Sequence, residues 1–514
     1  MTGSFPDKTY QRRIRAWTLY DWANHGYVTV TATTFFPPYF VAVASPAFAA
    51  GVGAAQARDT ASNVYAFAVS GALLAVAALA PIVGTVADLT GRRKRLLLLT
   101  TCLGAGLASA MVAVTTGRWV LALALYVGSQ IAVNIALGLN SSLLQHLARP
   151  EDIDRSSALG YAMGYVGGGL LLAIATATYL LADRFGISRD VAVRSAFFAV
   201  GVWWLGFAIP LAIGVAEPPA VPLAHGATGS PIRDALIRLS RTLRDLRGRR
   251  ELSTMLLAFW LYMEGIGAII LLATAYGAAL GLPTAALIGT LLLTQFVAFP
   301  YALVFGRIPD PTATRRGRAL AMVLWTAATL PAIGCVANYH GNLGVFLTLA
   351  LVAADQAVGF AFARALGDVL LERLAARLDA KRAIILGLAI YATIPIWGYF
   401  LRTEAEFFLI GVLVGSVQGG TQALSRAVYA ALSPRAKSGE FFGLYALSEK
   451  FAGILGPLLY GVVGEITHNP RASILSVALF LALGIAVLSR VDVRAGERAA
   501  AAEDAVIATA RAAD

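Results

Sequence analysis

The sequence predicts an all-α integral membrane protein with about fourteen spanning helices. Its 514 residues are 58% hydrophobic and only 14% charged, which excludes an ordinary soluble domain. Fourteen apolar stretches alternate with short polar loops, and each stretch is close to the length of about 20 residues that a helix needs to cross a bilayer. Nearly every second loop carries most of the positive charge, which is typical of a multi-pass topology.

The predicted spans follow one another from the N-terminus with one long interruption. They cover residues 16–44, 60–88, 96–116, 119–146, 156–183, 191–215, 252–279, 284–306, 319–339, 343–371, 383–401, 405–432, 439–465 and 472–489. By the positive-inside rule we expect both termini to be cytoplasmic, in the inner (plasma) membrane if the chain is bacterial. The net charge of +12 follows from this topology, so no nucleic-acid partner is predicted.

The interruption at 216–251 separates six spans from eight. Its arginines Arg238, Arg241, Arg244 and Arg247 recur every three residues, which indicates one helical face on an anionic membrane surface, with a partner-binding site as the alternative. The predicted units are an N-terminal bundle at 1–215, a basic cytoplasmic linker at 216–251, a C-terminal bundle at 252–490 and a cytoplasmic tail at 491–514. We expect the alanine-rich tail to be a frayed helix or disordered from Ala499.

A loop motif with a clear physical role follows the second span. Gly84, Asp88, Gly91, Arg92 and Arg93 match the pattern Gly-x-x-x-Asp-x-x-Gly-Arg-Arg, which resembles the signature of the major facilitator superfamily. Gly84 allows close helix approach and Gly91 permits a tight reversal, while Asp88 can bond Arg92 or the positive N-terminus of a neighbouring helix. We interpret these five residues as a gating latch; the alternative is that the basic residues only fix the topology.

Four further blocks narrow the resemblance. Residues 20–27 read Tyr-Asp-Trp-Ala-Asn-His-Gly-Tyr and resemble the opening of the vacuolar amino-acid effluxer-like permeases, the autophagy-related branch of the superfamily. Blocks at 140–169, 417–426 and 440–457 resemble the same family. The resemblance implies a major facilitator fold of two pseudo-symmetric six-helix bundles, with amino acids as the solute class.

The chain departs from the family pattern in two ways. The family usually has twelve spans, so an extra helix pair near 310–380 is predicted in the second half. His25 and Glu264 replace the more usual Ser and Asp, so the substrate or the coupling differs from the family pattern. An aromatic residue followed by a carboxylate opens each half, at Tyr20-Asp21 and at Tyr262 to Glu264, and this weak repeat agrees with two related bundles.

Polar groups at membrane depth are the candidate functional residues, because each is costly unless it is paired or faces water. A zwitterionic solute needs a carboxylate for its ammonium group, for which Asp21 or Glu264 is a candidate, and a cation for its carboxylate, for which Arg426 or Lys450 is a candidate. The alternative is that these residues pair and only hold helices together. The predicted substrate-binding set is Asp21, Asn24, His25, Tyr27, Glu264, Gln295, Gln418, Gln422, Arg426 and Lys450.

Three local patterns predict packing or pairing. Gln418, Gln422 and Arg426 recur every four residues and so share one helical face. Two glycine stripes, at 160–168 and at 411–419, predict tight helix contacts. Arg364 and Asp368 are spaced four apart in the extra pair, which predicts an ion pair on one helix.

The function predicted from these observations is secondary transport of a small polar solute by alternating access, with proton-coupled efflux as a candidate mechanism. No enzyme, cofactor or metal site is predicted, because the sequence has no phosphate loop, zinc pattern or nucleophile–base pair at useful spacing. We expect a monomer whose partners are the solute, protons and the lipid bilayer. The alternatives are an exporter of drugs or lipids on the same fold, and a membrane scaffold or sensor that transports nothing.

Overall fold

The computed structural model describes residues 8–51, 53–220, 248–310, 315–339, 345–451 and 454–513, with single positions at 313 and between 233 and 244. The regular elements in this part of the chain are all helices. Thirteen of them are long and apolar enough to cross a membrane, and α16 (Ser438–Phe451) with α17 (Leu455–Thr467) forms one more span in two pieces. The predicted all-α membrane fold of about fourteen spans is confirmed.

The first half consists of six spans. They are α1 (Lys8–Gly26), continued by the π-helical η1 (Tyr27–Phe35) and α2 (Phe36–Ala44), then α3 (Ala54–Thr90), α4 (Arg93–Ala110), α5 (Trp119–Leu147), α6 (Ile153–Leu180) and α7 (Arg189–Gly214). Helix α3 ends where Gly91 adopts the left-handed conformation (φ +63°), and α7 begins where the Ser188 side chain accepts a hydrogen bond from the N–H of Val191. Helix α1 packs against α6 and α7, and α4 packs against α5 and α7.

The second half repeats part of this packing. It contains α9 (Arg250–Ala279), α10 (Thr284–Arg307), α11 (Arg316–Tyr339), α12 (Val345–Phe362), the π-helical η7 (Ala363–Gly367), α13 (Asp368–Ala375), α14 (Ala380–Phe400), α15 (Glu404–Leu432), α16, α17, α18 (Pro470–Ser476) and α19 (Ala478–Ser489). Helix α9 packs against α19 as α1 does against α7, and α14 packs against α15 and α19 as α4 does against α5 and α7. This correspondence leaves α11 and the α12–α13 segment without a counterpart in the first half.

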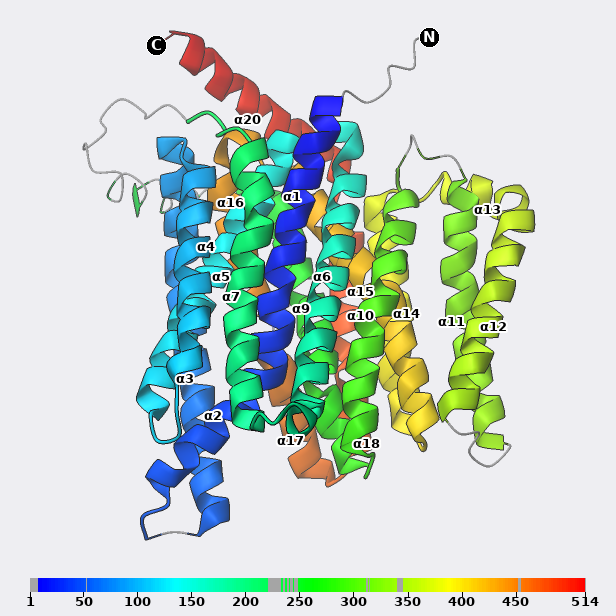
Figure 1. The fold of residues 1–514 in the computed structure, drawn as a ribbon. Coiled ribbons are helices and arrows are strands. Elements are labelled where there is room, and N and C mark those ends of the chain that lie inside the picture. The colour runs from blue at the N-terminus through cyan, green and yellow to red at the C-terminus, as the bar shows by residue number, and fades with distance from the viewer. Residues whose placement is uncertain are drawn as a thin grey trace.

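The unmatched segment lies at the edge of the bundle, beside α10 and α15 (Figure 1). In the most apolar stretch of the span Val345–Ala375, only 17% of the residues are buried, against 83% in α15. Helix α15 is therefore central, and α12 faces lipid. A polar network joins α12 to its neighbours: Tyr301 donates to Gln356 at 2.7 Å, and Trp325 and Thr329 donate to Asp355 at 3.1 and 2.9 Å. These bonds satisfy polar groups that would otherwise be exposed to hydrocarbon.

The predicted ion pair between Arg364 and Asp368 is wrong. Asp368 instead pairs with Arg318 of α11 at 2.6 Å. The cause is a competing arginine on the neighbouring helix: Arg318 of α11 reaches the Asp368 carboxylate, and Arg364 lines a cavity beside α10 and α11 instead.

Both termini lie at one end of the bundle, here called the terminal face, where α1 begins and α20 (Val493–Ala513) lies across the helix ends (Figure 1). The tail, expected to be frayed or disordered, is instead a docked helix. Glu503 pairs with Arg249 and with Lys437. Burial alone would raise the pKa of Glu503, but the hydrogen bonds and charges of these two partners outweigh burial and lower it.

Only a few residues of the basic linker belong to the part of the chain that the structure describes. Most of the residues from 221 to 247 lie outside the described part of the chain, and they include Arg238, Arg241 and Arg247. The predicted arginine face therefore stays a prediction. The two halves meet directly through α3 with α16, α6 with α10 and α15, and α5 with α16.

Candidate functional site

A cavity of about 240 Å³ lies between the two halves. Its walls come from α1, η1, α5 and α6 on one side and from α9, α10, α15 and α16 on the other. Among its lining residues are six of the predicted substrate-binding residues: Asp21, His25, Gln295, Gln418, Gln422 and Arg426. The shared face of Gln418, Gln422 and Arg426 therefore points into a space that both halves enclose.

Asp21 and Arg426 form an ion pair across the halves at the terminal end of this cavity. Arg426 Nη1 lies 3.2 Å from Asp21 Oδ2, and the two side chains are only 4% and 2% exposed. Asn140 of α5 donates to Asp21 Oδ1 at 2.8 Å. The Arg426 guanidinium also donates to the hydroxyl and to the backbone carbonyl of Ser157, each at 2.9 Å. Each charge is thus stabilised by the partner and by neutral groups that fix its orientation.

Aromatic rings hold the guanidinium from two sides. The Cζ atom of Arg426 lies 4.9 Å from the ring centre of Trp17 and 4.4 Å from that of Tyr161. Trp17 is itself fixed by donating to the backbone carbonyl of Asn140 at 2.9 Å. Cation–π contacts of this kind stabilise a desolvated arginine while leaving it able to exchange one anionic partner for another.

The wall above this pair is polar and aromatic. His25 Nδ1 lies 3.0 Å from the backbone carbonyl oxygen of Asp21, and its ring is 5.7 Å from that of Tyr165. Tyr165 donates to Gln422 Oε1 at 2.8 Å, across the two halves. The cavity therefore presents a titratable imidazole, a phenol and amide groups within one small volume.

Tight glycine contacts make room for this arrangement. A Cβ atom on Gly160 would contact Asp21 and Arg426, and one on Gly164 would contact the ring of His25. The predicted glycine seam on α6 is confirmed as a close contact with α1, and the second stripe, on α15, meets α10 in the same way.

Four predicted binding residues lie elsewhere or are not described. Asn24 of α1 and Tyr27 of η1 are both buried but do not line the cavity, and Tyr27 hydrogen bonds with the Ser129 hydroxyl at 2.6 Å. Glu264 is buried in α9, where its carboxylate accepts the N–H of Gly456 in the first turn of α17 at 2.8 Å. The side chain of Lys450 lies outside the described part of the chain.

Several residues of the site were missed by sequence reasoning. Asn134, Tyr161 and Tyr165 line the cavity, and Trp17, Asn140 and Ser157 contact the Asp21–Arg426 pair. Most of them fall within the family block at 140–169, where Tyr161 and Tyr165 follow Gly160 and Gly164 directly. This repeated Gly-Tyr pair is the sequence signal from which one face of α6 could have been predicted to line a site.

The residues predicted to form a latch lie at the terminal face, where the two halves meet. Asp88 accepts hydrogen bonds from the N–H groups of Gly439 and Glu440, at the N-terminus of α16, each at 2.9 Å. Its basic partner is Arg93, at 2.7 Å, and both side chains are fully buried. Of the two predicted partners, the N-terminus of a neighbouring helix is therefore present, as that of α16. The other, Arg92, is replaced by Arg93, because α4 begins at Arg93 after the Gly91 turn, and this leaves Arg92 exposed.

Backbone contact explains the small residues of the latch. A Cβ atom on Gly84 would contact the carbonyl group of Gly439, so α3 and α16 approach at van der Waals distance. Arg93 extends the contact by donating to the backbone carbonyl of Ala436 at 3.3 Å. Gln145 of α5 adds bonds to the backbone carbonyls of Ala430 and Ser433. These bonds between the two halves all lie between the cavity and the terminal face.

Within the described residues, no three His, Cys, Asp or Glu side chains are grouped so that they could hold a metal ion. The cavity and its latch therefore rest on charge pairing, amides and aromatic rings.

The chain is similar to known transport proteins along almost its whole length. It matches the family model described as vacuole effluxer Atg22 like over residues 9–351 and 353–501. It is 28% identical to the uncharacterized MFS-type transporter YxiO of Bacillus subtilis, over 94% of this chain and 95% of that protein. It is 26% identical to autophagy-related protein 22 of Cryptococcus neoformans over 67% of this chain, a match that spans 54% of the fungal protein. The crystal structure of the human organic anion transporter MFSD10 (TETRAN) has a similar fold, with a TM-score of 0.58, 15% identity and coverage of 93% of this chain and 99% of that chain.

Proposed function

The chain belongs to the Atg22-like family of vacuole effluxers and is a multi-pass secondary transporter of the major facilitator superfamily; on this premise we propose that its solute is an amino acid, bound as a zwitterion between Asp21 and Arg426. The observation that carries the proposal is the buried pair of opposite charges at one end of a small polar cavity. At about 30 Å³ of liquid volume per water molecule, 240 Å³ corresponds to roughly eight waters, which suits a small solute.

The ion pair itself gives the binding site its selectivity. When a solute enters, its carboxylate binds Arg426 and its ammonium group binds Asp21. Each buried side chain therefore exchanges one oppositely charged partner for another. A solute with a single charge leaves the other side chain unpaired in a buried site, which costs about 3–5 kcal/mol. Asn140 and Ser157 keep both side chains in place during the exchange. The site should therefore reject esters and N-acylated amino acids.

Alternating access follows from where the closed contacts lie. The chain's basic loops favour a cytoplasmic terminal face, so the arrangement described here is one that is closed to the cytoplasm. The opposite state requires loss of the Asp88 bonds to α16 and of the bonds from Arg426 to Asp21 and Ser157. Solute binding weakens the last contacts directly, because it removes Asp21 from Arg426. Binding in the cavity and opening of the terminal face are thus coupled through one residue pair.

For energy coupling, we assign proton exchange to Glu264, in the direction of efflux. Its carboxylate holds the first turn of α17, next to the interruption of the span that α16 begins. A proton on this carboxyl group would remove its charge from the helix N-terminus and weaken the contact between α9 and α17.

The alternatives are less well supported by the cavity. An exporter of drugs or lipids needs a wide apolar space that opens to the bilayer, and a scaffold needs no polar lining at all. The interhalf cavity is small and lined by Asp21, His25, Arg426 and amide groups. Both features favour a small polar solute.

A thermal-shift series on the purified protein tests the substrate class. L-amino acids should raise the melting temperature, with about 2.7 kcal/mol of added stability at a hundred times Kd, while their methyl esters and N-acetyl derivatives should not. Stabilisation by the esters equal to that by the free amino acids would exclude the proposed pairing. Proton coupling is tested separately: amino-acid transport in liposomes that ignores an imposed pH gradient, in wild type and in E264Q alike, would remove Glu264 from the mechanism.

A further inference from the structure

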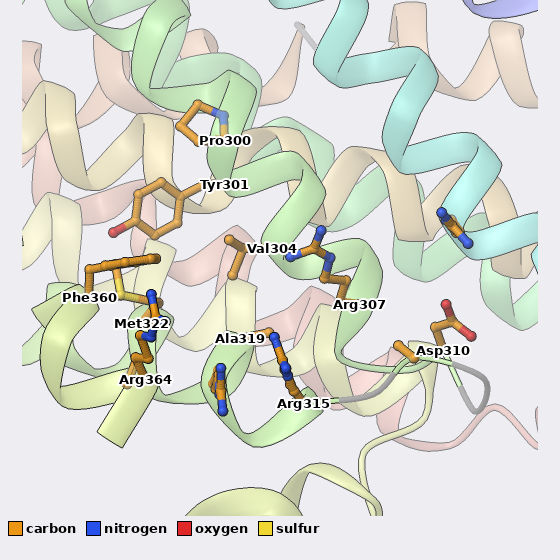
Figure 2. A pocket seen from close by; sticks show the side chains of 14 residues that line it. Pro300, Tyr301, Val304, Arg307, Asp310, Arg315, Ala319, Met322, Phe360 and Arg364 are labelled. Atoms are coloured by element: carbon orange, nitrogen blue, oxygen red, sulfur yellow. The ribbon is translucent and has the colours of Figure 1, made fainter. Parts of the chain in front are cut away.

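A second and larger cavity, of about 720 Å³, lies at the terminal face between α6, α10, α11 and the α12–η7 segment. Figure 2 shows Arg364 beside Met322 and Phe360, with Arg307 and Arg315 across the opening. Five arginines line the cavity: Arg155, Arg307, Arg315, Arg318 and Arg364. Among the described residues that line it, Asp310 is the only carboxylate. The cavity therefore carries a large excess of positive charge.

Most of this charge has no protein partner. Arg318 pairs with Asp368 at 2.6 Å. In the described part of the chain, the guanidinium groups of Arg155, Arg307, Arg315 and Arg364 form no ion pair or hydrogen bond with protein. Four unpaired guanidinium groups around one space repel one another, and their planar, forked geometry fits a phosphate group, which can bond several of them at once.

The walls indicate that the phosphate is part of a lipid. Tyr301, Val304, Met322 and Phe360 form an apolar side of the same cavity, and Phe360 is 60% exposed. Arg307 is the last residue of α10, so the charged mouth lies where helices leave the membrane, while α12 faces hydrocarbon. A free anion would use the arginines and leave this apolar side unfilled. An acyl chain fills it.

We propose that this cavity binds an anionic phospholipid, with the phosphate among Arg155, Arg307, Arg315 and Arg364 and an acyl chain along Tyr301 and Phe360. Basic pockets between membrane helices are typical sites for anionic headgroups. The proposal assigns a role to the peripheral segment, because α11 and α12–η7 supply about half of the site. It is independent of which solute the central cavity carries.

The site also spans the two halves. Arg155 belongs to α6 of the first half, and the other four arginines belong to the second half. Nearby, α6 and α10 touch so closely that a Cβ atom on Gly306 would contact Ala158. A lipid held by Arg155 and Arg307 together therefore bridges a seam that must part when the terminal face opens, and it should favour the closed state.

Lipid binding to the delipidated protein in detergent tests the proposal. The melting temperature is measured against dioleoyl phosphatidylglycerol, dioleoyl phosphatidylcholine and soluble glycerol 3-phosphate. The double variant R307Q/R364Q removes two unpaired arginines, and at about 1 kcal/mol for each it should bind phosphatidylglycerol about thirtyfold more weakly. R373Q is the matched control, since Arg373 is an exposed arginine of α13 that does not line the cavity. It should leave binding unchanged.

The outcomes separate the possible ligands. Stabilisation by phosphatidylglycerol that is lost in the double variant and kept in R373Q supports the proposal. Equal stabilisation by phosphatidylcholine, or by glycerol 3-phosphate alone, would overturn it in favour of a nonspecific lipid effect or a free-anion site. Unchanged binding in R307Q/R364Q would also overturn it. R364K keeps the charge and should retain most of the binding, which gives a readout even if the double variant does not fold.

Discussion

The Asp88 latch offers the sharpest perturbation of the closed state. Three buried hydrogen bonds to Asp88 are described, one from Arg93 within the first half and two from the N–H groups of Gly439 and Glu440 in the second half. Only the last two are lost when the halves separate. The N–H groups of Gly439 and Glu440 bond to different oxygens of Asp88, and D88N keeps only one oxygen as an acceptor. One of the two bonds is therefore lost and the other becomes neutral, and each change costs about 1 kcal/mol. The closed state should therefore lose about 2 kcal/mol, or about thirtyfold in its equilibrium with the open state.

Distance measurements between spin labels detect this shift. Glu151 and Ala376 are exposed residues on opposite halves near the terminal face, and labels there should report longer distances in D88N than in wild type. The native Cys102 and Cys335 are first replaced by Ala. D183N is the control, because Asp183 belongs to an exposed ion pair, which contributes little. Identical distance distributions for D88N and wild type would refute the latch.

Three further predictions concern the cavity and the tail. R426K keeps the charge but loses the fork that joins Asp21 to Ser157, so transport in proteoliposomes should fall at least about tenfold; full activity would contradict the bidentate role. G160A should abolish transport by pushing a methyl group into the ion pair, whereas G106A, which adds a methyl group in open space, should transport normally. The folded state lowers the pKa of Glu503, so the stability that Glu503 contributes is present at neutral pH and is lost as the pH falls through that pKa. The difference in melting temperature between wild type and E503Q should therefore disappear below pH 4.5. A difference that persists in acid would contradict the ion pairs of Glu503.

The features that the sequence predicted best were those with a regular period. Apolar length predicts the spans, and the four-residue spacing of Gln418, Gln422 and Arg426 correctly predicts one face in the cavity, because helix geometry alone fixes both. The latch was predicted in outline for the same reason: Gly91 marks a turn and Asp88 a helix end. Its partner was not, since the choice between Arg92 and Arg93 depends on where α4 begins.

Contacts between helices that are far apart in the sequence could not be predicted from residue spacing. Asp21 meets Asn140, and Arg426 meets Ser157, through contacts between helices far apart in the sequence. Glu264 has the burial and depth expected of a binding residue, but it faces the interruption between α16 and α17 instead of the cavity. A helix interruption and a π-helical turn such as η7 both change which residues before and after them share a face. No repeating pattern of residues in the sequence marks either feature.

The proposed transport mechanism requires Asp21 and Arg426 to exchange their mutual ion pair for contacts with a zwitterionic solute. Counterflow of a radiolabelled amino acid in proteoliposomes tests this most directly, with wild type, D21N and R426Q compared at equal reconstitution. We expect counterflow in wild type that falls at least about tenfold in each variant and is not inhibited by the methyl ester of the same amino acid. Counterflow of undiminished rate in both variants would contradict it.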